Sequence, residues 1–235
     1  MKQNYFEPTW SSIKQHQTPN WFKKAKFGIY AHWGIYSVPA AGPNVTWYPY
    51  WMYRPPSPQF DYHCKHYGHP SKFGYKDFIP MFTAEKFNAE EWADLYYRSG
   101  AKFAGPVAEH HDGFPMWNCS DTEWCASKMG PKRDIVGELA KAIRNKGMKY
   151  MVAMHHAENW FFFPHWNNDF DTSKKEYESL YGELHNLDLI GNQAVYPDHW
   201  GRKNEHQDKP SKAFHDRWLN RLKEVVDNYL SLIHI

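Results

Sequence analysis

Histidines follow three short apolar runs of the sequence: His32, His110 and His155. An imidazole ring can hydrogen-bond a polar ligand, and it is also the commonest side-chain ligand for metal ions. Three histidines are enough for a catalytic zinc site, but the spacings His-Glu-x-x-His and His-x-His are both absent. We therefore expect a ligand-binding group of histidines with no metal and no cofactor, and keep a histidine-dependent metallohydrolase as the less favoured alternative.

The apolar runs predict three buried strands, at residues 27–31, 103–108 and 150–154. In parallel α/β folds the carboxyl ends of the strands form the ligand-binding face. Because side chains alternate along a strand, counting along each run places His32, His110 and His155 in one phase. We expect these three side chains to face the pocket, although the opposite phase stays open.

Helical patterns alternate with these runs. Asn88 is a candidate cap for a helix that ends near Gly100, and Asp134 for one that ends near Gly147. A third apolar stripe covers about residues 211–229. Alternating strands and helices predict a parallel sheet, either open or closed into a barrel.

Aromatic residues and carboxylates lie close to the same histidines. Aromatic residues make up 18% of the chain, and Trp33 and Trp47 follow the first run. Flat apolar rings with polar edges suit sugars, although packing in the core explains most such rings equally well. The carboxylates Glu109, Asp112 and Glu158 could serve acid–base chemistry, but such groups more often orient their neighbours or cap helices.

Composition excludes several classes of partner. The chain has 235 residues with 28 Lys plus Arg against 26 Asp plus Glu, and it has no dense basic run, so neither nucleic acid nor an anionic membrane is expected as a partner. No apolar run is long enough to span a membrane. The start of the chain shows no secretion signal, which leaves the compartment open, and the three cysteines form no disulfide framework or zinc spacing. A neutral small ligand is the best candidate.

Four sequence blocks resemble the α-L-fucosidases of glycoside hydrolase family 29: residues 26–40, 73–78, 108–114 and 129–134. The resemblance implies a (β/α)₈-like (TIM) barrel and the release of terminal α-L-fucose from glycans with retention of configuration. It also implies that His32 and His110 hydrogen-bond the fucose hydroxyls, with His111 beside them and Trp47 against the sugar. Trp33 and His155 complete the expected binding group, His155 on strand phase alone. Many members have Glu where this chain has Thr46.

The resemblance also bears on catalysis. In the family the nucleophile is an aspartate at the end of the strand that follows the helix of residues 211–229. Here residues 230–235 read Leu-Ser-Leu-Ile-His-Ile, which looks like a translated sequencing adapter. We therefore expect residues 1–229 to be the N-terminal part of the barrel, about three βα units with no catalytic residue, and residues 230–235 to be a non-native tail. A non-catalytic fucose-binding module is the main alternative.

Overall fold

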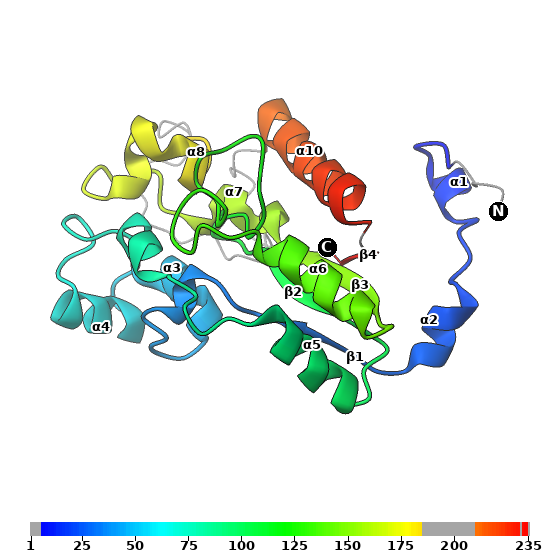
Figure 1. The fold of residues 1–235 in the computed structure, drawn as a ribbon. Helices are drawn as coiled ribbons and strands as arrows, with labels where there is room; N and C mark the ends of the chain where they lie inside the picture. The colour runs from blue at the N-terminus through cyan, green and yellow to red at the C-terminus, as the bar shows by residue number, and fades with distance from the viewer. Residues whose placement is uncertain (1–5, 185–209, 231, 235) are drawn as a thin grey trace.

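A parallel sheet runs through the middle of the computed structural model, which describes residues 6–184, 210–230 and 232–234 (Figure 1). The described strands follow the chain order β1–β2–β3–β4 across the sheet. They are β1 (Gly28–Ala31), β2 (Phe103–Glu109), β3 (Lys149–Met154) and β4 (Leu232–His234). The three predicted strands are confirmed to within one residue at each end.

The first three strands begin at the same level of the sheet. Gly28 pairs with Phe103, and Phe103 pairs with Lys149, so the carboxyl ends of β1, β2 and β3 meet at one edge. A Cβ atom on Gly105 would lie 1.6 Å from the Met151 carbonyl oxygen, so only glycine allows β2 and β3 to approach this closely. Near its end β2 changes register between Val107 and Glu109.

Helices α5 (Ala89–Arg98) and α6 (Ile135–Asn145) cover one face of the sheet, and α10 (Lys212–Tyr229) lies beside α6 (Figure 1). The predicted caps are confirmed. The Asn88 side chain accepts hydrogen bonds at the start of α5, and Asp134 does so for α6. The structure adds Ser211, which was not predicted as a cap and caps α10 in the same way. Gly100 and Gly147 have φ angles of +89° and +75°, which glycine adopts without strain, and the chain there leaves each helix for the next strand.

Two long segments, one between β1 and α5 and one after β3, contain short helices that pack on the core. Between β1 and α5 these are η1 (Ile35–Ser37), η2 (Val45–Trp47), α3 (Tyr48–Trp51), α4 (Pro58–His66) and η3 (Tyr75–Met81). After β3 they are η4 (His156–Glu158), α7 (Asn159–Phe162), η5 (Asp171–Ser173), η6 (Lys175–Tyr177) and α8 (Glu178–Tyr181). Two others, α1 (Trp10–Ile13) and α2 (Asn20–Ala25), precede the sheet. Residues 185–209 of the second segment lie outside the described residues.

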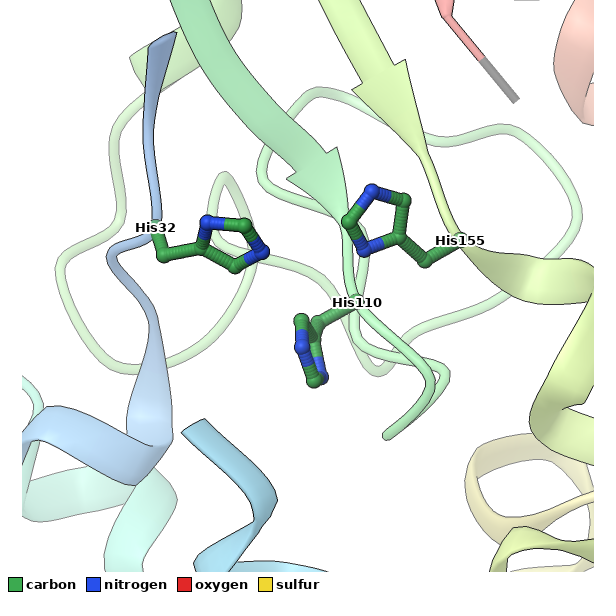
Figure 2. A group of neighbouring side chains, drawn as sticks. All are labelled: His32, His110 and His155. Atoms are coloured by element: carbon green, nitrogen blue, oxygen red, sulfur yellow. The ribbon is translucent and has the colours of Figure 1, made fainter. Parts of the chain in front are cut away.

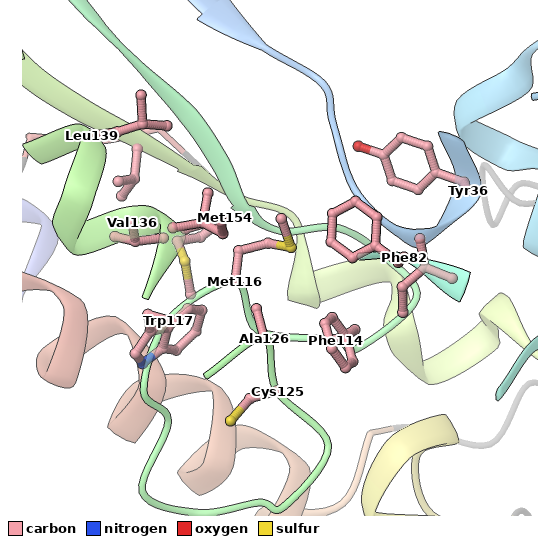
Figure 3. Close-up of a cluster of buried hydrophobic side chains, with 14 of the residues drawn as sticks. Tyr36, Phe82, Phe114, Met116, Trp117, Cys125, Ala126, Val136, Leu139 and Met154 are labelled. Carbon is pink, nitrogen blue, oxygen red and sulfur yellow. The ribbon is translucent and has the colours of Figure 1, made fainter. Parts of the chain in front are cut away.

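The core lies between α6, the sheet and the segment that follows β2 (Figure 3). Val136 and Leu139 of α6 meet Met154 of β3 there, and Trp117 is completely buried beside them. Burying an aromatic or aliphatic side chain of this size contributes about 1.5–3 kcal/mol to folding. None of the described helices is long and apolar enough to cross a membrane.

Within the described residues, the strands form an open arc rather than a closed barrel. Parallel strands alternating with helices agree with part of a (β/α)₈ fold. The structure differs from the expected three strands because the backbone of Leu232–His234 pairs in parallel with β3. Residues expected to be a non-native tail thus provide β4.

Candidate functional site

Three histidines converge at the carboxyl ends of β1, β2 and β3 (Figure 2). His32 follows β1, His110 follows β2 and His155 follows β3. One ring nitrogen of each lies within 4.8 Å of those of the other two, and the ring centroids are 5.3 to 5.6 Å apart. The structure therefore shows the expected phase, with the three side chains pointing toward one another.

His111 and Trp47 extend this group on one side. The His111 ring stacks on His155 at a centroid distance of 5.1 Å, and its Nδ1 lies 2.8 Å from the His155 carbonyl oxygen. The Trp47 ring centroid is 5.0 Å from that of His111. Five of the six predicted binding residues are thus brought together, and we call His32, His110, His111, His155 and Trp47 the histidine rim.

Trp33, the sixth predicted residue, has a different environment. Its ring packs against Phe82, Phe87 and Trp92, with centroid distances of 5.0 to 5.2 Å. These four rings are among the residues that line one pocket, which contains no member of the histidine rim. Trp33 follows His32 directly, and its ring contacts anchor the segment that carries His32 to these three aromatic side chains.

Several aromatic side chains that sequence analysis did not single out adjoin the histidine rim, among them Tyr36 and Phe162. Tyr36 of η1 lies 4.9 Å from His110 between ring centroids, and Phe162 of α7 lies 5.5 Å from His111. Tyr36 belongs to the block that resembles the family, which is a signal that could have found it. Phe162 lies in a stretch of aromatic residues with no distinguishing pattern.

The histidines of the rim differ in their exposure to solvent. His110 is 3% exposed, His155 is half-buried and His32 is exposed. Burial lowers the pKa of His32, and burial together with the neighbouring imidazoles lowers the pKa of His110 well below its ordinary value. Burial also lowers the pKa of His111 to about 4. At neutral pH these rings are uncharged, so each can donate one hydrogen bond and accept another, which suits sugar hydroxyls.

A buried charged group lies on the opposite side of the same strand ends. Glu109, which precedes His110, places Oε1 2.6 Å from Nδ1 of His156 and 2.5 Å from Nη1 of Arg221. All three side chains are at most 1% exposed. Burial opposes the charge of Glu109, but Arg221 and His156 outweigh this and lower the pKa of Glu109 below its usual range.

Arg221 connects α10 to two other parts of the chain. Its Nε and Nη2 donate to the Asp121 carboxylate at 3.1 and 2.9 Å, and Nη1 reaches Glu109 at the end of β2. We call Glu109, Asp121, His156 and Arg221 the buried ion network. No sequence signal indicated Arg221, because its partners lie about a hundred residues earlier in the chain.

Asp112 is also buried and fixed by hydrogen bonds. The Tyr75 hydroxyl donates to its Oδ2 at 2.7 Å, and the Phe114 amide donates to its Oδ1 at 3.1 Å. Burial raises the pKa of Asp112 to about 7. Glu109 and Asp112 thus organise the end of β2, while Glu158 ends η4. This agrees with the alternative that such carboxylates orient their neighbours.

Residues 1–234 match the Alpha-L-fucosidase family. The chain belongs to this family. Human plasma α-L-fucosidase is 46% identical over 142 residues, a match that covers 60% of this chain and 30% of that protein. Human tissue α-L-fucosidase is 35% identical over a match that covers 91% of this chain and 49% of that protein. The family membership predicted from the motifs is confirmed.

Solved structures give the same result for the fold. The crystal structure of Thermotoga maritima α-fucosidase in complex with fucose superimposes with a TM-score of 0.72 at 33% identity, covering 98% of this chain and 50% of that one. The complex of that enzyme with a mechanism-based inhibitor also gives a TM-score of 0.72. The chain thus spans about half or less of the length of the family members it matches.

Proposed function

We propose that this chain represents part of an exo-α-L-fucosidase and that its histidine rim binds terminal α-L-fucose of a fucosylated glycan. The observation that carries the proposal is the convergence of imidazoles from three strand ends, with Trp47 beside them, in a chain of the α-L-fucosidase family. Relatives with the same fold include an α-fucosidase crystallised with fucose. Nucleic acid is not part of the proposal, because the chain has nearly balanced charge.

Each member of the histidine rim has a part in this proposal. His32 and His110 exchange hydrogen bonds with the sugar hydroxyls, because uncharged imidazole offers both a donor and an acceptor. Trp47 covers an apolar face of the sugar. His111 contacts both Trp47 and His155, and its bond to the His155 carbonyl oxygen supports the orientation of the group.

The proposed reaction is a double displacement with retention of configuration. Such a reaction needs two carboxyl groups about 5–5.5 Å apart, one as nucleophile and one as acid and base. Glu109 is held by His156 and Arg221, and Asp112 by Tyr75 and the Phe114 amide. The proposal therefore assigns no catalytic residue to these 235 residues and expects fucose binding without turnover.

We also propose that residues 230–235 are a non-native tail, as their adapter-like sequence indicates. Their pairing with β3 is compatible with this origin, because an open sheet edge accepts a short extended segment through its backbone alone.

Two measurements on the purified 235-residue chain test the proposal. Calorimetry with L-fucose should show saturable binding to one site, with D-fucose as the mirror-image control that gives no heat. An aryl α-L-fucoside should release no phenol above the uncatalysed rate. Measurable turnover would contradict the assignment of no catalytic residue, and failure to bind L-fucose by a cooperatively folded chain would contradict the histidine rim as its site.

Two other functions predict different results. A dedicated fucose-binding module would bind L-fucose, and a longer chain of the family with the same histidine rim would also show no hydrolysis of the aryl fucoside. A histidine-dependent metallohydrolase is favoured only by the proximity of the three ring nitrogens. It would contain stoichiometric metal and lose activity with a chelator.

A further inference from the structure

The nitrogen atoms of the histidine rim have a second chemical capacity. His32, His110 and His155 each offer one ring nitrogen, and all three atoms lie within 4.8 Å of one another (Figure 2). We propose that these three histidines bind one divalent transition metal ion in the space that the sugar would occupy. Only the overlap with the sugar rests on the proposed function; the metal site itself rests on the three side chains.

To bind one ion, the three ring nitrogens must move closer together than the 4.8 Å within which they now lie. Zinc–nitrogen bonds are about 2.0–2.1 Å long, which places tetrahedral ligand atoms about 3.4 Å apart. His110 is buried, whereas His155 is half-buried and His32 is exposed. The two more accessible rings have more room to rotate toward His110, so an ion would have one buried ligand and two more adjustable ones.

The donor set selects the kind of ion. Three imidazoles with no carboxylate among them favour Zn²⁺, Cu²⁺, Ni²⁺ and Co²⁺ over the oxygen-seeking Mg²⁺ and Ca²⁺. A second observation supports a ligand here: Nδ1 of His110 is buried and has no hydrogen-bond partner among the described residues. A buried polar atom left in this way costs stability, which a bound ligand at the cluster could recover.

Such an ion would be a competitor of the sugar rather than a cofactor. The proposed reaction runs through carboxyl groups, and it requires the imidazoles to be free for hydroxyl groups. An ion that binds the nitrogens of His32 and His110 removes those hydrogen-bonding sites. We therefore expect transition metals to block fucose binding.

Metal titration of the 235-residue chain tests the site directly. After chelator treatment, Zn²⁺ calorimetry should show one ion per chain, and Co²⁺ should give a visible absorption band typical of nitrogen ligation. His155→Ala and His32→Ala should each weaken Zn²⁺ affinity at least about tenfold, since even residues outside the ligand set commonly change it by 10–100-fold. His215→Ala, an exposed histidine on α10, is the matched control and should leave the affinity unchanged. No stoichiometric binding, or equal affinity in all three variants, would overturn the metal site.

A competition experiment separates this inference from the proposed function. L-fucose should bind the metal-free chain and lower the apparent Zn²⁺ affinity as its concentration rises. If L-fucose binds the metal-free chain but leaves Zn²⁺ affinity unchanged, the overlap is wrong. If L-fucose does not bind the metal-free chain, the proposed function fails, while one-to-one Zn²⁺ binding that depends on His155 still supports the metal site. Hydrolysis that appears only with added Zn²⁺ would overturn the role of competitor.

Discussion

Glu109 and His110 are neighbours in the chain, yet Glu109 belongs to a group of paired charges and His110 to a cluster of imidazoles. His110 faces the histidine rim with His32 and His155, whereas Glu109 is paired with Arg221 and His156 on the other side. After β3 the same division recurs, with His155 in the rim and its neighbour His156 in the buried ion network. Alternating residues at two adjacent strand ends thus place clustered imidazoles on one face and paired charges on the other.

The difference teaches that the two faces meet different demands. His32, His110 and His111 of the histidine rim have lowered pKa values and are uncharged at neutral pH, so their hydrogen-bonding capacity remains for a ligand. The buried ion network uses its charges internally, and through Arg221 it joins α10 to the end of β2. We infer that the network fixes the strand ends from which the histidine rim projects.

The largest expected effect comes from breaking the buried ion network. Arg221→Met leaves the Glu109 charge buried with only His156 as partner, which should lower the free energy of unfolding by about 3–5 kcal/mol. Urea unfolding measures this change. Arg98→Met, which breaks the exposed pair with Asp94, is the matched control and should cost at most about 1 kcal/mol.

A double variant sharpens this test. Glu109→Gln combined with Arg221→Met removes both charges, so it should recover part of the stability lost in Arg221→Met alone. If Arg221→Met alone has a free energy of unfolding no lower than that of Arg98→Met, the network does not hold the strand ends.

The next largest effect is a pH dependence that resides in Asp112. Its pKa is about 7 in the folded chain, so between about pH 4 and 7 the folded state keeps a proton that the unfolded state has lost. The free energy of unfolding should therefore fall through this window as the pH rises, by a few kcal/mol in total, and the contribution should level off above pH 7.

Asp112→Asn removes this titrating group. The difference in the free energy of unfolding between wild type and variant, measured against pH, therefore reports on Asp112 alone. His32, His110 and His111 contribute the opposite slope, because their lowered pKa values make the unfolded state bind more protons below about pH 6.5. That contribution is common to both chains. Urea unfolding from pH 4.5 to 8 should show the difference changing below pH 7, and a constant difference would contradict the raised pKa.

A smaller effect should separate binding from folding. His110→Ala removes a hydrogen-bonding group of the histidine rim, so we expect about tenfold weaker L-fucose binding by calorimetry. His156→Ala, on the other face, should lower the free energy of unfolding because it takes a partner from Glu109. At a temperature where it remains folded, its fucose affinity should stay within about threefold of wild type. Equal losses of affinity in both variants would remove the distinction between the two faces.

The smallest effect concerns the two tryptophans. Trp47 contacts His111, whereas Trp33 packs against Phe82, Phe87 and Trp92. Trp47→Leu should therefore weaken L-fucose binding several-fold, and Trp33→Leu should change it less than about twofold. Fluorescence titration measures both, and a larger loss in Trp33→Leu would place that ring at the sugar.

Much of this arrangement follows from local sequence. Asn88 and Asp134 predict their helices because their side chains satisfy the first free amides, and strand alternation places His32, His110 and His155 in one phase. The role of Arg221 is not predictable in this way, because only the folded chain brings α10 to Glu109. The environment of Trp33 likewise depends on rings from distant segments.

Histidine NMR on the ¹⁵N-labelled 235-residue chain, titrated with L-fucose, tests the central claim most directly. The account predicts that the ring nitrogens of His32, His110, His111 and His155 shift together and saturate at one concentration, while His156 and the exposed His215 stay unchanged and D-fucose has no effect. Unchanged rim signals at saturating L-fucose, or equal shifts of His156 and the rim, would contradict the assignment of the histidine rim as the fucose site.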